Sequence, residues 1–108
     1  MATSLGRATL INVPNALTTL YTVPASTITS IISLYLSNKT GSTITVRVGI
    51  IPSGGSITYV GYDTPIPVGG SLNVINNKPI VVTAGDVLQV FCSNGTACDA
   101  VASLLVQT

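Results

Sequence analysis

The chain has 108 residues, and only 6% of them are charged: four basic residues, three aspartates, no glutamate and no histidine. A chain of this size suits one domain, since it buries roughly 65% of the surface that it exposes when unfolded. Soluble domains average about 25% charged residues. A surface with so few charges does little to keep a free protein soluble and monomeric, which favours a chain that belongs to an assembly. The net charge of +1 gives no electrostatic footprint for nucleic acid or an anionic membrane.

The apolar runs are too short for a membrane-spanning helix, because Ser, Thr, Asn, Gly or Pro interrupts each one well before about 18 residues. The N-terminal residues lack the basic-then-apolar order of a secretory leader. Together with Met1, this favours a chain that is made in a cytoplasm.

β-Branched residues and threonines occur throughout the chain, Gly and Pro interrupt them about every ten residues, and no stretch has a sustained helical period. This pattern is typical of an all-β sandwich or barrel. We expect roughly eight to ten short strands in a single jelly-roll or Greek-key β-sandwich domain over residues 7–108. Residues 1–6 are expected to form a flexible N-terminal arm.

The first strands are expected at residues 7–13 and 17–23, and each is stopped by a proline. The longest candidate covers residues 27–38. A nearly continuous apolar row at its alternate positions is predicted to lie in the core: Ile28, Ser30, Ile32, Leu34 and Leu36.

Residues 44–50 have the most regular alternation of apolar and other side chains, which predicts one buried face and an outward Arg47. The turn at residues 38–42 predicts that this strand pairs with residues 27–38 as a hairpin. Residues 52–56 are expected to form a loop before a strand at residues 57–62.

The prolines within residues 63–67 lack the N–H donors of a central ladder, which predicts an edge or a corner. Gly69 and Gly70 are expected to form a turn before a strand at residues 72–75.

Residues 76–92 contain strand, turn and strand, with Gly85 and Asp86 in an expected hairpin turn. A second hairpin is expected to close the chain, with strands at residues 87–92 and 99–106 and a turn around Asn94-Gly95.

No set of residues predicts catalysis. The absence of histidine excludes Ser-His-Asp and Cys-His arrangements, and the three aspartates are interpreted as caps and turn residues. Two cysteines without histidine make a poor metal site. We therefore expect no catalytic residue, no cofactor, no metal and no small-molecule substrate.

Cys92 and Cys98 flank the second turn, where a short hairpin loop centred on Gly95 would place them opposite each other. Cross-strand neighbours lie about 4.5 Å apart at Cα, which a disulfide accepts. A disulfide between Cys92 and Cys98 is thus one interpretation. The other is two separate thiols, one of them in the core.

Tyr59 and Tyr62 lie near loops, where they would either stack on a sugar or anchor a protein partner. The alternative is that both are ordinary half-buried strand tyrosines.

Four segments, taken in order, carry a resemblance to a known family: LYTVPA (residues 20–25), NKTGS (38–42), IPVGGSL (66–72) and KPIVVTAGDVL (78–88). Over roughly residues 17–106 the chain resembles small β-sandwich virion proteins of tailed bacteriophages. The resemblance implies a capsid decoration (cement) protein. Such a protein binds and stabilises the lattice of the major capsid protein, as a homotrimer or homodimer, in a virion assembled in the bacterial host cytoplasm.

Two other functions remain open at this point. One is a tail, baseplate or fibre component of the same fold. The other is a carbohydrate-binding module that uses Tyr59 and Tyr62.

Overall fold

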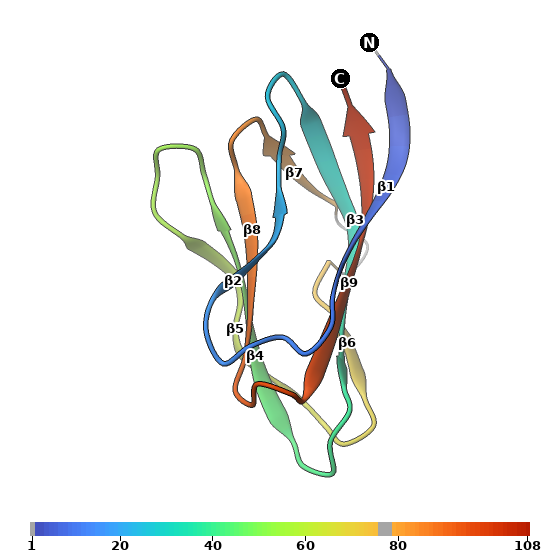
Figure 1. Cartoon of the computed structure of the whole chain (residues 1–108), viewed down its shortest axis with the longest axis vertical. Helices are drawn as coiled ribbons and strands as arrows, with labels where there is room; N and C mark the ends of the chain where they lie inside the picture. Colours follow the sequence, from blue (N-terminus) through green and yellow to red (C-terminus); the bar gives the residue numbers. More distant parts are fainter. Residues whose placement is uncertain (1, 76–78) are drawn as a thin grey trace.

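The computed structural model describes residues 2–75 and 79–108, and it confirms the all-β class: within these residues nine strands form two antiparallel sheets packed face to face (Figure 1). Met1 of the expected arm and Lys78 of the KPIVVTAGDVL motif lie outside the described residues. The strands are β1 (Thr3–Leu10), β2 (Thr18–Thr22), β3 (Ile28–Asn38), β4 (Ile44–Ile51), β5 (Thr58–Ile66), β6 (Ser71–Asn73), β7 (Ile80–Thr83), β8 (Val87–Cys92) and β9 (Cys98–Gln107).

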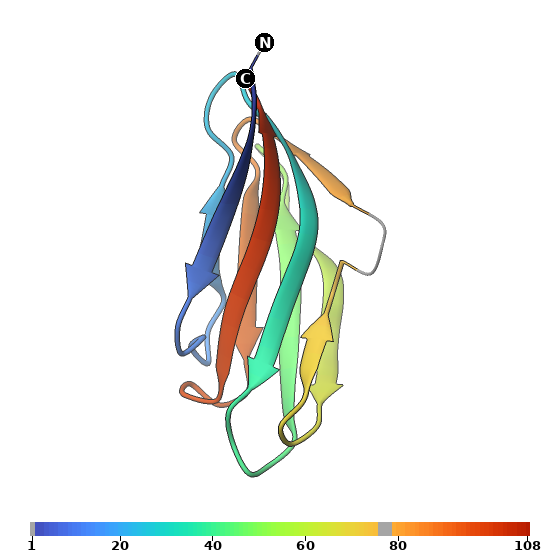
Figure 2. The ribbon, with the colours of Figure 1, turned by 90° about the vertical axis from the view of Figure 1, so that its right-hand side faces the viewer.

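The five-stranded sheet has the order β1-β9-β3-β6, with β7 pairing with β3 on the same side as β6, and the four-stranded sheet has the order β2-β8-β4-β5. Figure 2 shows the five-stranded sheet in front of the other, with both termini at one end of the sandwich. Most consecutive strands lie in different sheets, which is the arrangement of a jelly roll. The expected sandwich is therefore confirmed.

The core lies between the two sheets, where β3, β4, β8 and β9 contribute most of the alternately buried residues. The expected alternation is confirmed for residues 44–48, since Ile44, Val46 and Val48 are buried and Arg47 points outward, and it breaks at Gly49, which is buried, where the pairing with β5 shifts. Polar contacts also join the two sheets, and one of them is between the hydroxyl groups of Tyr21 on β2 and Thr29 on β3, which lie 3.0 Å apart.

The expected hairpins are wrong. β3 pairs with β6, β7 and β9 in one sheet, whereas β4 pairs with β5 and β8 in the other. The closing pair is split in the same way, since β8 pairs with β2 and β4, and β9 with β1 and β3. A buried face looks the same in either sheet of a sandwich, so alternation cannot distinguish a hairpin from a connection that crosses the core.

The expected apolar row on residues 27–38 is wrong in its first half. A register shift between Ile31 and Ser33 moves the strand by one residue against β9. Thr29 and Ile31 therefore point inward, and Ile28 and Ile32 are 43% and 39% exposed. Inserting one residue in a strand exchanges its two faces, which explains the reversal.

The N-terminal segment also differs from the expected arm. Residues 3–6 form the first half of β1 and pair with β9, from Thr3 opposite Gln107 to Gly6 opposite Leu104. The weak alternation of TSLG (residues 3–6) does not predict a strand. These residues form one because β9 is long enough to pair with them. The edge position of the proline segment is confirmed, since Pro65 lies in β5 at the edge of the four-stranded sheet.

Candidate interaction surface

A cluster of aromatic and charged side chains lies on the outer face of the four-stranded sheet. Its position follows from a β-bulge in β5. Val46 pairs with Thr64 and Val48 with Gly61, so the single residue Arg47 faces both Tyr62 and Asp63. Asp63 has a φ of 50°, in the left-handed region that non-glycine residues rarely adopt. Because a bulge redirects side chains, both Tyr62 and Asp63 reach Arg47.

Arg47 is the centre of this cluster. Its Nε donates to Asp63 Oδ1 at 2.7 Å and its Nη2 to Asp63 Oδ2 at 3.3 Å. The guanidinium carbon lies 4.3 Å from the ring centre of Tyr62 and 4.7 Å from that of Phe91, its neighbour on β8. The hydrogen bond with Asp63 is the main cause that raises the pKa of Arg47. Arg47 therefore stays charged, and its charge lies directly against the Asp63 carboxylate.

Tyr59 completes the cluster. Its ring meets that of Tyr62 at 4.8 Å between centres and at 82°, a T-shaped contact. The structure thus brings together the two tyrosines that the sequence singled out. We name the set the aromatic–arginine cluster: Arg47, Tyr59, Tyr62, Asp63 and Phe91.

The aromatic–arginine cluster remains accessible, since Tyr62 is 57% exposed and Tyr59 36%. Tyr and Arg are the residue types most enriched among side chains that dominate binding energy. Contacts within the cluster restrain the rotamers of Tyr59, Tyr62 and Arg47, so these side chains lose less conformational entropy on binding. The two tyrosine rings are nearly perpendicular, so they do not form one flat platform for a sugar. The arrangement fits a protein partner better than a glycan.

Sequence reasoning found the tyrosines but missed Phe91, Asp63 and the role of Arg47. The available signal was Arg47 itself, an outward cation on the most regularly alternating strand. The bulge that brings the other side chains to it has no comparable signature.

The outer face of the five-stranded sheet is a second accessible surface. Tyr35 on β3 and Val101 on β9 are direct cross-strand neighbours on it, and they are 48% and 41% exposed. Val81 on β7 adds a third exposed apolar side chain. These side chains make the face mildly apolar rather than a deep groove.

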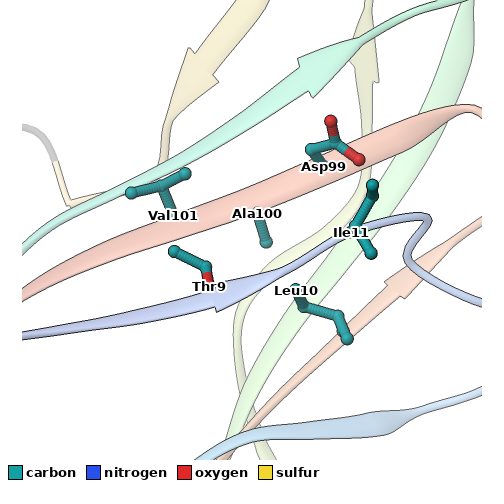
Figure 3. Close-up of a pocket in the computed structure, with 6 residues that line it drawn as sticks. All are labelled: Thr9, Leu10, Ile11, Asp99, Ala100 and Val101. Carbon is teal, nitrogen blue, oxygen red and sulfur yellow. The ribbon is translucent and has the colours of Figure 1, made fainter.

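An open hollow of about 390 Å³ lies where β1 ends and β9 begins (Figure 3). Its lining residues are Thr9, Leu10, Ile11, Asp99, Ala100 and Val101. The only carboxylate there is already engaged: Asp99 accepts from the backbone N–H of Asn12 at 2.9 Å and pairs with Lys39 Nζ at 2.9 Å. These partners, the Asn12 N–H first, lower the pKa of Asp99. The hollow therefore contains no pair of carboxylates for acid–base chemistry.

Gly85, Asp86 and the pair Gly69-Gly70 occupy turns. Gly85 has a φ of 88°, and an added Cβ would lie 2.8 Å from Ser53 Oγ. The Asp86 carboxylate accepts from the backbone N–H groups of Thr83 and Ser53, each at 2.9 Å. The turn is present as expected, but it connects β7 to β8 in the other sheet and is not a hairpin. Gly69 has a φ of 70° and the N–H of Gly70 donates to Pro67 O at 2.9 Å, between β5 and β6.

Cys92 and Cys98 are both free and fully buried. They lie at the two ends of the connection between β8 and β9, which crosses from one sheet to the other. Burial is the main cause that raises the pKa of the Cys98 thiol to about 12. A buried thiol that resists ionisation is a poor nucleophile and a poor metal ligand.

No family model matches the sequence, and no curated protein sequence is significantly similar to it. Among solved structures, the chain is similar to one in the acidic stable capsid structure of Helicobacter pylori bacteriophage KHP30. The TM-score is 0.61 at 15% sequence identity, and the match covers 99% of this chain and 89% of that one. At this identity the likeness shows a common fold over nearly the whole chain.

The described residues contain neither a cluster of metal ligands nor a membrane-spanning helix. Within residues 2–75 and 79–108, no three His, Cys, Asp or Glu side chains come together as metal ligands would. In the same part of the chain, no helix is long and apolar enough to cross a membrane. The aromatic–arginine cluster therefore remains the strongest candidate for a functional surface.

Proposed function

We propose that this chain is a non-enzymatic structural protein of a phage virion, and that it decorates the capsid. In this role it binds the outside of the major capsid protein lattice and stabilises the assembled shell. The observation that carries the proposal is the common fold with a chain of a phage capsid structure over 99% of this sequence. The resemblance of its sequence segments, in their order, to those of small virion proteins of tailed bacteriophages also supports it.

The surface chemistry supports the same proposal. With 6% charged residues, the chain presents mainly uncharged polar and apolar side chains to its surroundings. Such a surface is better suited to permanent burial in an assembly than to keeping a free monomer soluble. A subunit that binds only the assembled shell stabilises that shell by mass action, by RT ln(1 + [L]/Kd) at each site.

The aromatic–arginine cluster is the proposed contact with the capsid protein. Exposed, restrained Tyr59 and Tyr62 would supply most of the binding energy, as in other interfaces where a few aromatic residues dominate. Because Arg47 is neutralised by Asp63 at 2.7 Å, the contact should depend little on salt.

The test uses expanded capsids that lack this protein. Purified chain should coat them in a saturable way and raise the temperature at which they break. Tyr62→Ala should raise the Kd at least tenfold, because a truncated central aromatic costs about 2 kcal/mol or more. The matched control is Tyr35→Ala, a tyrosine of similar exposure on the opposite face. If neither the wild type nor the control variant binds capsids, the proposal is wrong.

The number of copies of this chain in each phage particle distinguishes a capsid protein from a tail protein. Hundreds of copies in each particle would support decoration, whereas a few or tens of copies would place the chain in a tail, baseplate or fibre.

One observation favours a carbohydrate-binding module as the second candidate, namely the two adjacent exposed tyrosines. Glycan binding that is lost in both Tyr59→Ala and Tyr62→Ala would support it. Capsid binding without glycan binding would reject it.

A further inference from the structure

The outer edge of β1 offers a complete set of backbone groups for another strand. Ala2 and Thr108 exchange both of their backbone hydrogen bonds, at 3.1 and 2.9 Å. In an antiparallel ladder such pairs alternate with pairs whose groups point away from each other. Since β1 and β9 keep one register throughout, the residues of β1 that point their N–H and C=O groups away from β9 are Thr3, Leu5, Arg7 and Thr9.

The other sheet edges have features that hinder strand addition. β2 has a register shift after Thr19, and β5 has two shifts and Pro65. β6 and β7 have only three and four residues. Bulges, prolines and short length are the usual means of protecting an edge. β1 has none of them: it has eight residues, no register shift and no proline.

The edge of β1 is also accessible. Figure 1 shows β1 at the margin of the sandwich, next to β9. Leu5 is 79% exposed, the largest exposed fraction among the large apolar side chains of the described residues. The only charge on the strand is that of Arg7. A long, nearly uncharged edge strand without a bulge favours pairing with another strand.

We propose that β1 pairs antiparallel with β1 of a second copy of this chain. The two five-stranded sheets would then become one continuous sheet across a two-fold axis. A second copy is the favoured occupant because the edge is self-complementary: an antiparallel pair of identical strands satisfies the outward donors and acceptors of both copies at once.

Charge selects the register of this pair. A pair centred on Gly6 uses all four outward residues and places Leu5 opposite the partner's Arg7. A pair centred on Arg7 would place two guanidinium groups directly opposite each other, which is unfavourable. A pair centred on Leu5 would place Thr9 opposite residue 1, outside β1. The register centred on Gly6 therefore makes the most hydrogen bonds without opposing like charges.

The dimer would have a consequence for binding to a lattice. The two-fold axis of an antiparallel edge pair is perpendicular to the sheet, so both four-stranded sheets lie on the same side. Both aromatic–arginine clusters would then face one surface, and a regular lattice could engage both at once. The pairing itself concerns the free chain and does not rest on the proposed function.

The first test is the mass of the full chain in solution by sedimentation and native mass spectrometry. We expect a dimer of twice the 11.0 kDa chain mass. Leu5→Lys would place a lysine opposite the partner's Arg7 at two symmetric positions, and it should raise the dimer Kd roughly tenfold or more. Leu5→Lys/Arg7→Asp restores opposite charges in this register and should recover the dimer.

The matched control is Val81→Lys, which adds the same charge at an exposed apolar residue on β7, at the opposite edge of the same sheet. It should leave the dimer Kd unchanged. Thermal midpoints verify that each variant is folded, which is expected because Leu5 and Val81 are 79% and 61% exposed.

Hydrogen exchange tests the strand edge directly. The amides of Leu5 and Arg7 should be protected only at concentrations where the dimer forms, whereas those of Ser4 and Gly6 should be protected at all concentrations because they bond to β9. A monomer at high concentration, a trimer as the smallest species, or a Leu5→Lys variant that dimerises like the wild type would overturn the proposal. A dimer that fails to bind capsids would count only against the proposed function.

Discussion

Asn38 holds together the turn after β3 and the end of β5, so its replacement by alanine tests how the sandwich is closed at this end. The side chain is 6% exposed. Its Nδ2 lies 2.8 Å from Ser42 O, 3.0 Å from Ile66 O and 3.2 Å from Pro67 O. Its Oδ1 accepts from the backbone N–H and the hydroxyl of Thr40 at 2.9 and 2.8 Å.

The expected cost follows from the groups left without partners. Nδ2 has two protons, so alanine removes two donated bonds as well as those accepted by Oδ1. The bond to Ile66 O is buried, and an unpaired buried carbonyl costs about 1–3 kcal/mol. With about 1 kcal/mol more for the exposed bonds, Asn38→Ala should lower the free energy of unfolding by about 2–4 kcal/mol. That is a large part of the 5–15 kcal/mol typical of a domain.

Urea denaturation followed by circular dichroism measures this loss, and the melting temperature should fall by roughly 10 °C or more. Asn15→Ala, at an exposed asparagine, is the control and should change stability by less than about 0.5 kcal/mol. If Asn38→Ala proved no more destabilising than Asn15→Ala, the hydrogen bonds of Asn38 would not be what closes this end.

Asn38→Asp sharpens the test through its pH dependence. The introduced carboxylate faces carbonyl oxygens, so its charged form is disfavoured and its pKa should be raised in the folded state. A group with a raised folded-state pKa loses stability as pH rises. Relative to the wild type, this variant should therefore lose the least stability in acid and progressively more towards neutral pH. Stability that increased towards neutral pH would contradict this account of the site.

Three further outcomes are expected. Because burial raises the pKa of Cys98 to about 12, thiol reagents should react only slowly with the folded protein at pH 8. In denaturant, both cysteines should react readily. If neither reacted in denaturant until a reductant was added, the two would form a disulfide. Tyr21→Phe should cost about 1–2 kcal/mol by leaving the buried Thr29 hydroxyl unpaired, and adding Thr29→Val should cost less than the sum of the two single changes. Backbone N–H donors lower the pKa of Asp86 and Asp99 from the usual carboxyl value. Their stabilisation is therefore present above the unfolded-state pKa and is lost as pH falls through the lower folded-state values. With no Glu or His, the melting temperature should stay flat from about pH 8 to 5, and a marked fall within that range would contradict this reasoning.

The sequence by itself determined the fold class and most strand positions. Strands were expected at residues 17–23 and 44–50, and the structure has Thr18–Thr22 and Ile44–Ile51. These features are local: alternation sets which residues share a face, and Gly and Pro mark the turns. The same local rules placed Arg47 outward and Pro65 at an edge.

Only the tertiary structure decided which sheet each strand joins. Both sheets bury the same kind of apolar face, so the segments around Gly41, Gly85 and Gly95 were expected to form hairpins and instead connect the two sheets. The bulges in β3 and β5 were equally hidden, because one extra residue leaves no mark in composition. They exposed Ile32 and brought Tyr62 to Arg47.

The candidate site shows the same division. Residue type alone selected Tyr59 and Tyr62, since exposed aromatics near loops favour binding. Phe91 is far from them in the chain, and it joins them because β8, β4 and β5 are neighbours in one sheet. Strand pairing over long sequence separations is governed by burial and loop closure of the whole chain, not by local preference, and for that physical reason the sequence alone did not determine it.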